Sequence, residues 1–285
     1  MRYRQLLSLF WITLAIGTLT SVSVAETAKA QNQESAPTAE EAQSDQARGQ
    51  AAFIAGDYRQ AFSIFKPLAQ DGNRVAQFGI GYMSEKGLGV RVDEAAAVTW
   101  YTKAADQGVA LAQLNLGLMY AEGRGVAKND AAAAKLFLAA AEQGNGQAQA
   151  NLGALYFSGK GVDPSFAEGL GWLKKAAEQD IDTAQHNLAT IYYTGQGVPK
   201  DFETAARWYT KAAERGFPPS QYNLATLYFN GDGVEKNPIE GYKWVIISAA
   251  GGLAIAEDAK KALANTLTAE QITSAEELAR EWRKK

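Results

Sequence analysis

Few side chains in this chain of 285 residues are suited to covalent chemistry. Cysteine is absent, so the sequence excludes a cysteine nucleophile, a thiolate metal site and a disulfide. His186 is the single histidine, so a catalytic triad or a multi-histidine metal site would depend on this one residue. We therefore expect no enzyme activity, no metal and no cofactor.

One serine stands at a spacing that some enzymes use. Ser63-Ile-Phe-Lys66 has the Ser-x-x-Lys spacing of penicillin-interacting enzymes, but no Lys-Thr-Gly or Lys-Ser-Gly sequence accompanies it. Ile64 and Phe65 fit the apolar face of a helix. These features favour a structural role for the segment. The Ser-x-x-Lys spacing nevertheless gives the alternative function, a weak hydrolase or a binder of penicillin-like or cell-wall compounds, with Ser63 as its test position.

Glycine-rich tetrapeptides also raise the question of phosphate binding. The pattern Gly-x-Gly-Val occurs five times at a constant spacing of 36 residues, beginning at Gly87, Gly123, Gly159, Gly195 and Gly231. None of the five continues into Gly-x-Gly-x-x-Gly or Gly-Lys-Ser/Thr, and none follows a predicted strand. We interpret them as turns between helices. A repeat of this length is typical of a solenoid, in which each repeat buries its apolar face against its neighbours.

The repeat predicts two helices in each unit. In the second full repeat they are expected near 110–122 and 130–143, and Gly144 stands where a helix ends in a left-handed glycine. Polar N-cap residues recur in register before the second helices: Asp93, Asn129, Ser165, Asp201 and Asn237. Tryptophans recur in the second helices and are interpreted as packing residues: Trp100, Trp172, Trp208 and Trp244.

The N-terminus has the features of an export signal. Arg2 and Arg4 precede an apolar stretch over 6–24, and Ser23-Val24-Ala25 predicts cleavage after Ala25. Ala28-Lys29-Ala30 is a second possible cleavage site. The alternative is an uncleaved membrane anchor, because the apolar stretch is long for a signal peptide. After cleavage we expect no membrane span.

The predicted domains follow from these patterns. They are a signal peptide (1–25), a disordered linker (26–44), an N-terminal capping unit (45–73), five repeats (74–252) and C-terminal capping helices (253–285). Asp57 begins a helix of the capping unit. Asp180 replaces a helix-ending glycine, and the sequence offers no reason for it.

The repeated residues resemble the Sel-1-like repeat family, relatives of tetratricopeptide repeats. The pattern is spelled Ala112-Gln-Leu-Asn-Leu-Gly-Leu-Met-Tyr120 in one first helix and Ala205-Ala-Arg-Trp-Tyr-Thr-Lys-Ala-Ala213 in one second helix. The resemblance implies an all-α fold, a right-handed α/α solenoid of about five full 36-residue repeats. It also implies an adaptor or scaffold whose first helices line a concave groove. Exported bacterial members of the family regulate sensor kinases or assist polysaccharide assembly.

Candidate groove residues lie on the first helices. Asn115, Asn151, Asn187 and Asn223 each precede a core leucine, and they either bind a partner's backbone or bond an adjacent repeat. His186 lies at a variable position, which favours a solvent-facing side chain that contacts either solvent or a partner. The predicted groove set is Phe78, Tyr82, Asn115, Leu118, Asn151, His186, Asn187, Thr190, Tyr222, Asn223 and Thr226.

The overall charge limits the choice of partner. The formal charge of −3 and the pI near 5.4 argue against nucleic acid, which selects a clustered basic surface. We therefore expect a non-enzymatic adaptor that binds another protein or an extended peptide segment. We expect it in the periplasm of a Gram-negative cell, or secreted.

Overall fold

The computed structural model describes residues 45–282, so the predicted export signal and linker lie outside the described residues. Within that range every regular element is an α-helix, which confirms the predicted all-α fold. The described chain divides between Gly169 and Leu170 into two compact units. We call residues 45–169 the leading unit and residues 170–282 the trailing unit, and the division falls inside α10 (Phe166–Glu178).

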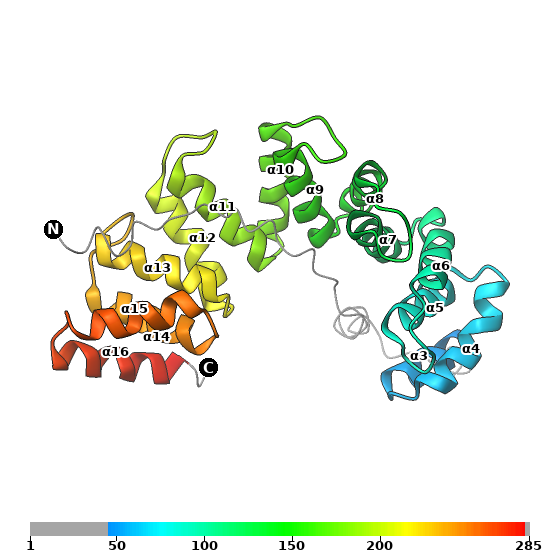
Figure 1. Ribbon diagram of the computed structural model, residues 1–285, viewed down its shortest axis with the longest axis horizontal. Helices are drawn as coiled ribbons and strands as arrows, with labels where there is room; N and C mark the ends of the chain where they lie inside the picture. The colour runs from blue at the N-terminus through cyan, green and yellow to red at the C-terminus, as the bar shows by residue number, and fades with distance from the viewer. Residues whose placement is uncertain (1–44, 283–285) are drawn as a thin grey trace. The chain divides into compact units, whose positions relative to one another are not determined.

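Each repeat consists of two helices of 13 residues. The pairs are α5 (Arg74–Lys86) with α6 (Glu94–Asp106), α7 (Ala110–Glu122) with α8 (Asp130–Glu142), α9 (Gly146–Ser158) with α10, α11 (Asp182–Thr194) with α12 (Phe202–Glu214), and α13 (Pro218–Asn230) with α14 (Pro238–Ala250). Helices adjacent in sequence pack together, for example α5 with α6 and α6 with α7 (Figure 1). This local packing is what defines an α-solenoid.

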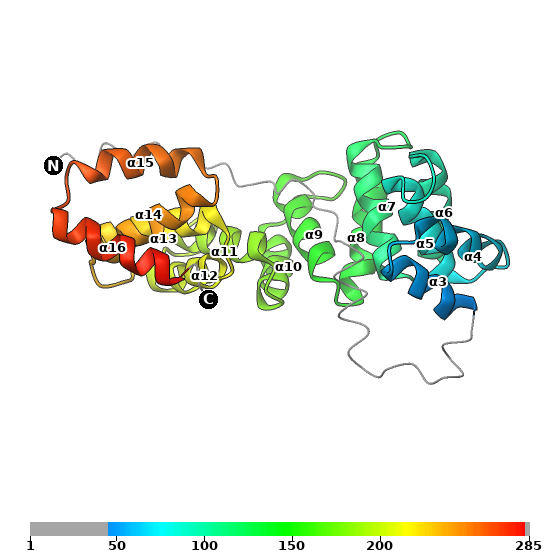
Figure 2. The ribbon, with the colours of Figure 1, turned by 90° about the horizontal axis from the view of Figure 1, so that it is seen from below.

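Within residues 45–282, four further helices flank the repeats. α3 (Asp45–Ile54) and α4 (Tyr58–Gln70) precede them, and α15 (Ala254–Ala264) and α16 (Ala269–Trp282) follow. Figure 2 shows α15 and α16 apart from one another, and both pack against α14. The ring of Trp282 on α16 meets that of Trp244 on α14 edge-on, with 5.8 Å between the ring centroids. These helices cover the apolar side of the last repeat.

The predicted N-caps are confirmed. At all five positions the side-chain oxygen accepts a hydrogen bond from a backbone amide two or three residues further on. Asp57 caps α4 in the same way, by accepting from the amide of Gln60. Thr268 and Gln271 form a reciprocal capping box at the start of α16. The caps explain why the second helices begin at the same place in every repeat.

The Gly-x-Gly-Val loops are helix-ending turns. The first glycine ends the first helix in the left-handed region, as Gly123 does with φ 74°. The second glycine also has a positive φ, which is 63° at Gly125, and a Cβ there would lie 2.5 Å from the carbonyl carbon of Glu94. Gly89 makes the same close approach to Tyr58 in the preceding helix pair. Both glycines are therefore needed for the turn and for its contact with the preceding helix.

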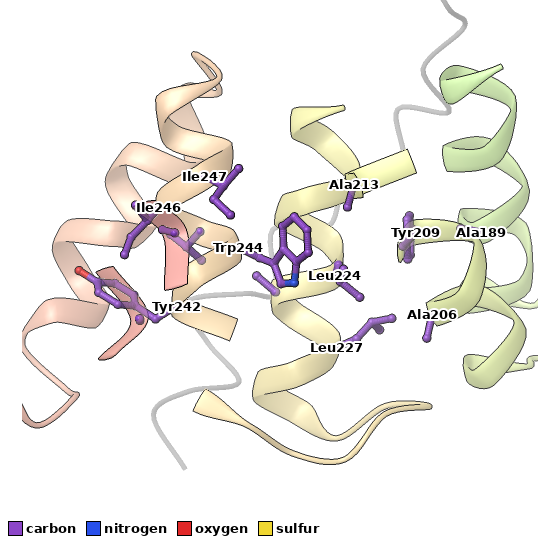
Figure 3. Packing of buried hydrophobic residues seen from close by; sticks show 14 of the residues in the cluster. Ala189, Ala206, Tyr209, Ala213, Leu224, Leu227, Tyr242, Trp244, Ile246 and Ile247 are labelled. Carbon is purple, nitrogen blue, oxygen red and sulfur yellow. The ribbon is translucent and has the colours of Figure 1, made fainter. Parts of the chain in front are cut away.

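The core is built from the recurring small and aromatic residues. In the trailing unit, Leu224 lies between the buried Trp244 and Tyr209, and Ala213 allows the helices to approach (Figure 3). Trp244 is buried, which confirms its predicted packing role. Trp100, Trp172 and Trp208 are partly buried, and each has a lysine amine 4.0–4.5 Å from its ring centroid.

Candidate binding face

The predicted groove residues differ in how far solvent reaches them. Four side chains are partly exposed: Tyr82, Asn187, Tyr222 and Asn223. Seven are buried: Phe78, Asn115, Leu118, Asn151, His186, Thr190 and Thr226. In α7 every residue from 112 to 119 is buried, and Leu118 is only 1% exposed. The prediction that these seven side chains line a partner-binding groove is therefore corrected, because packing against neighbouring helices covers them.

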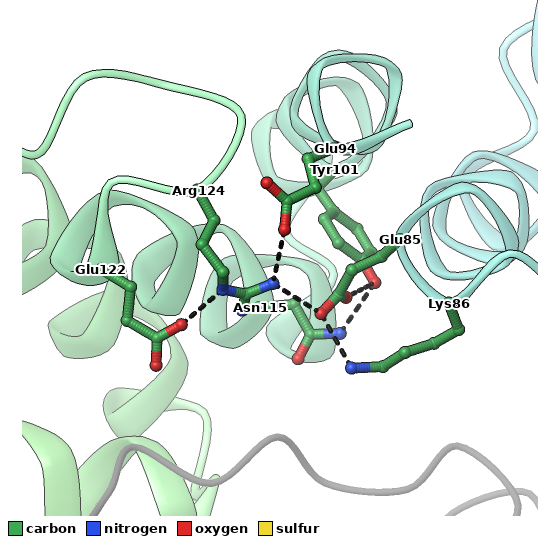
Figure 4. Close-up of polar contacts among 7 residues, drawn as sticks. All are labelled: Glu85, Lys86, Glu94, Tyr101, Asn115, Glu122 and Arg124. Atoms are coloured by element: carbon green, nitrogen blue, oxygen red, sulfur yellow. Dashed lines mark hydrogen bonds and ion pairs between the residues drawn. The ribbon is translucent and has the colours of Figure 1, made fainter. Parts of the chain in front are cut away.

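A charged network surrounds a buried tyrosine in the leading unit (Figure 4). The Tyr101 hydroxyl on α6 donates to Glu85 Oε2 at 2.8 Å and accepts from Asn115 Nδ2 at 3.1 Å. Glu85 Oε1 also accepts from Lys86 Nζ at 2.9 Å and from Arg124 Nη1 at 3.1 Å. Asn115 thus bonds α6 of the preceding repeat, which confirms the second of its two predicted roles.

The network keeps the buried carboxylate charged. Burial opposes ionisation of Glu85, but the hydrogen bonds from Lys86, Tyr101 and Arg124 outweigh it and lower its pKa. Burial, followed by the charge of Glu85, raises the pKa of Tyr101 well above its usual value. Glu85 is therefore an acceptor already engaged within the fold, and it is not a free acid or base.

Arg124 and Asp232 show a contact that the sequence analysis missed. Each is the variable residue of a Gly-x-Gly-Val loop, and each reaches a side chain 39 residues earlier, at the end of the preceding first helix. Arg124 pairs with Glu85, and Asp232 hydrogen-bonds Tyr193 and contributes to its raised pKa after burial. Complementary residue types at a separation of 39 would have indicated these pairs.

His186 is buried in the trailing unit, with 8% exposure, so the expectation of a solvent-facing side chain is wrong. Its Nδ1 lies 2.9 Å from Ser220 Oγ on α13. The ring packs 5.5 Å from the ring of Tyr209 and 5.4 Å from that of Phe217, measured between centroids. Burial lowers its pKa to about 4, because a charged imidazole would lose its hydration there. The neutral ring therefore joins α11 to α13.

The second buried tyrosine, Tyr209, also lies in the trailing unit. Its hydroxyl is 2.8 Å from Thr190 Oγ1. Thr190 Oγ1 itself donates to the backbone oxygen of His186. Burial raises the pKa of Tyr209 to about 12, although its hydrogen bonds to Thr190 and Asn223 act in the opposite direction. Thr190 is thus engaged in the interior, while Asn223 remains partly exposed.

Asn151 differs from Asn115 and Asn223. Its Nδ2 is buried without a hydrogen-bond partner, although its Oδ1 accepts from Gln147 at 3.3 Å. The residue 14 positions earlier is Phe137, which has no hydroxyl, whereas Tyr101 and Tyr209 hold that position relative to Asn115 and Asn223. The missing tyrosine oxygen explains the unpaired nitrogen of Asn151.

Other candidate chemistry has little geometric support in the described residues. Ser63 donates its hydroxyl to the backbone oxygen of Gln60 at 2.8 Å, within its own helix. Among residues 45–282, no three histidine, aspartate or glutamate side chains gather as a metal site would require. No helix of that range combines the length and apolarity needed to cross a membrane.

The exposed part of the candidate face is therefore small. In the trailing unit it consists of Asn187 on α11 and of Tyr222 and Asn223 on α13, which we call the α11–α13 strip. The bond between His186 and Ser220 holds these two helices together beside it. In the leading unit the exposed member is Tyr82, whose ring packs on Phe53 and Phe78.

Comparison with known proteins identifies the repeat. The Sel1 repeat matches the chain five times, over residues 74–109, 110–145, 146–181, 182–217 and 218–253. The crystal structure of a Sel1 repeat protein from Oxalobacter formigenes is 32% identical, with a TM-score of 0.73, over 84% of this chain and 95% of that one.

A second similar structure is c5321, a protective antigen of uropathogenic Escherichia coli that displays the same kind of repeat fold. It is 31% identical, with a TM-score of 0.75, over 92% of this chain and 56% of the antigen. No curated protein matches the chain significantly. Five matched repeats in register, together with these two structures, show that the chain belongs to the Sel1 repeat family.

Proposed function

We propose that this protein is a non-enzymatic, exported scaffold that binds a partner protein, or an extended segment of one, through the exposed part of its first helices. Sel1 repeat proteins generally mediate protein–protein interactions. The observation that supports a specific site is the α11–α13 strip, where two asparagines and a tyrosine are partly exposed on adjacent first helices. Tyrosine is enriched among residues that dominate binding energy.

The proposed location rests on the N-terminal sequence. Two arginines followed by an apolar stretch and a small-x-small site are features of a cleaved export signal. A partner would then be a component of the cell envelope, in signalling or in polysaccharide assembly. Cell fractionation and the N-terminal mass test this location. A mature chain that begins at Glu26 supports export, and an intact Met1 in the cytoplasmic fraction contradicts it.

Site-specific photocrosslinking in living cells tests the binding face. A photoreactive residue at Tyr82 or Tyr222 probes the exposed first-helix positions, and Lys135 and Arg207, which are exposed on second helices, serve as controls. We expect a single envelope protein to be captured from Tyr82 or Tyr222 and from neither control. Capture from the controls alone would contradict the proposed face. Capture from no position would favour the alternative of a small cell-wall ligand.

A further inference from the structure

Building on the proposed function, we infer that the bound segment carries a hydrophobic side chain close to a lysine or arginine, and that it docks where the first-helix face ends. The docking residues are Pro219 and Tyr222 on α13 and Ile255 and Asp258 on α15, which we call the α13–α15 surface. Tyr222 belongs also to the α11–α13 strip. The inference rests on the exposure of these side chains and on the charge around them.

The repeat brings these residues of α13 and α15 together. α15 begins 36 residues after α13, in register with the repeats. His186 on α11 contacts Ser220 in the first turn of α13, at a separation of 34 residues. Tyr222 holds the position of His186 one repeat later, and the same separation leads to the buried Ala256 in the first turn of α15. The repeat therefore places Tyr222 beside the first turn of α15, next to Ile255.

The hydrophobic part of the surface is accessible to a partner. Ile255 is the one large hydrophobic side chain of residues 170–282 that is exposed, with 48% exposure. Pro219 holds the same position one repeat earlier, and both it and Tyr222 are partly exposed. No helix of the described chain follows α15 on this face, because α16 packs against α14 and lies apart from α15 (Figure 2). A hydrophobic side chain of a partner would remove these groups from water, which favours binding.

Negative charge lies beside the hydrophobic groups. Asp258 holds the position of Tyr222 one repeat later, and its exposed carboxylate forms no ion pair or hydrogen bond with residues 45–282. Residues 254–282 include six acidic and three basic side chains, which gives a net charge of −3. A lysine or arginine of the partner can therefore pair with Asp258 without displacing an existing contact. The same excess of acid disfavours a nucleic acid or an anionic membrane.

The spacing of the two groups limits the sequence that fits. Ile255 and Asp258 are three residues apart in one helix, so they lie on the same side of α15, with their Cβ atoms about 5–6 Å apart. Two side chains that are close in the sequence of a partner can span this distance. The surface therefore selects a hydrophobic residue and a basic residue within one short segment.

Selection from a displayed library of random dodecapeptides, with the full chain as bait, tests the inference. We expect the enriched peptides to place a lysine or arginine within about one helical turn of a large hydrophobic residue. Fluorescence anisotropy then measures the Kd of a selected peptide at low and at high NaCl concentration. The Kd should rise about threefold or more at high salt, because salt screens an exposed ion pair.

Two variants of exposed residues locate the contact. Ile255→Ser and Asp258→Lys should each weaken binding about tenfold. Glu142→Lys makes the same change of charge at the exposed end of α8 and should leave the Kd unchanged. A peptide whose basic residue is replaced by glutamate should bind Asp258→Lys better than it binds the parent chain. Thermal melting followed by circular dichroism checks that all variants are folded.

The outcomes separate the inference from the proposed function. Peptides that lose affinity for Tyr222→Ala but bind Ile255→Ser and Asp258→Lys as well as the parent would overturn the inference and leave the proposed function standing. If Tyr222→Ala also binds normally, the proposed face fails. A selection that enriches no basic peptide would overturn the inference. A dimer of the chain that Asp258→Lys abolishes would assign the surface to a second copy and overturn it as well.

Discussion

Two buried tyrosines, one in each compact unit, occupy the same place in the repeat but stand in different chemical surroundings. Tyr101 and Tyr209 are separated by 108 residues, or three repeats of 36, and both are almost fully buried. Each hydroxyl bonds an asparagine 14 residues later, Asn115 or Asn223. The other partner is the charged Glu85 in the leading unit and the neutral Thr190 in the trailing unit.

The comparison shows which partners the two networks share and which differ. The tyrosine and the asparagine maintain the contact between a second helix and the first helix that follows it. The remaining partner comes from two different positions of the first helix, because Glu85 corresponds to Tyr193 in the repeat and Thr190 corresponds to Tyr82. The leading network is consequently ionic and the trailing one neutral. We expect the two units to respond to acid in different pH ranges.

The largest expected effect is the loss of stability of the trailing unit in acid. The pKa of His186 is about 4 in the folded protein against 6.5 unfolded, so below pH 6.5 the unfolded chain takes up a proton that the folded chain does not. The protonation of His186 therefore leaves the free energy of unfolding unchanged above pH 6.5. As the pH falls towards 4, it lowers that free energy by about 3 kcal/mol in total. Hydrogen exchange of α11 and α13, corrected for intrinsic rates, measures it.

The leading unit provides the contrast. The pKa of Glu85 is lowered, so its contribution is present above the ordinary value of 4.5 and is lost only as the pH falls through the lower folded value. Peptides of α5 and α6 should therefore stay protected at pH 5. A His186→Phe variant should lose the pH dependence between 6.5 and 4.5. Equal deprotection of both units at pH 5 would refute the proposed difference.

Removing the hydroxyl of Tyr101 or of Tyr209 in separate variants compares the two networks directly. Tyr101→Phe leaves the buried Asn115 without its acceptor and Glu85 with one donor fewer, so we expect a loss of about 2 kcal/mol. Tyr209→Phe should cost about 1 kcal/mol, because Thr190 keeps its bond to a backbone oxygen and Asn223 can reach water. Urea denaturation followed by circular dichroism measures both. A larger loss in Tyr209→Phe would contradict this ranking.

The fold was largely predictable from the sequence because its determinants are local and repeated. A cap such as Asn129 acts on an amide three residues away, and Gly123 ends the helix that it follows. Such interactions can be read from residue types at fixed spacing. The helix predicted near 110–122 agrees with α7, and the one predicted near 130–143 agrees with α8 to within one residue.

The candidate site was less predictable because exposure depends on neighbouring helices. Asn115 and Asn223 hold the same position, yet the first is buried and the second partly exposed. The variability at His186 favours a solvent-facing side chain, but the ring is buried and contacts Ser220 and Phe217. Sequence spacing identifies the helix face, and packing decides which of its residues remain accessible.

A tyrosine at position 137 would add a third network to the two that exist. Phe137→Tyr places a hydroxyl where Tyr101 and Tyr209 have theirs, within reach of the unpaired Asn151 Nδ2. We expect a gain of about 1 kcal/mol, seen as a rise in Tm of roughly 2–4 °C. The gain should vanish in an Asn151→Ala background. A loss of stability in both backgrounds would show that the hydroxyl does not fit.

The smallest expected effect concerns the one described non-glycine residue with positive φ. Asp180 has φ 59° where Gly144 and Gly216 occupy the same repeat position, and its carboxylate accepts from Gln185 Nε2 at 3.0 Å. That nitrogen also donates to the backbone oxygen of Ala177, so losing the carboxylate leaves it bonded. Asp180→Gly should therefore stabilise the trailing unit by about 0.5–1 kcal/mol through relief of the left-handed strain.

Asp180→Ala keeps the strain without the hydrogen bond and should destabilise the trailing unit, as urea denaturation can show. If glycine and alanine destabilise equally, the hydrogen bond to Gln185, and not the backbone conformation, accounts for the aspartate at this position.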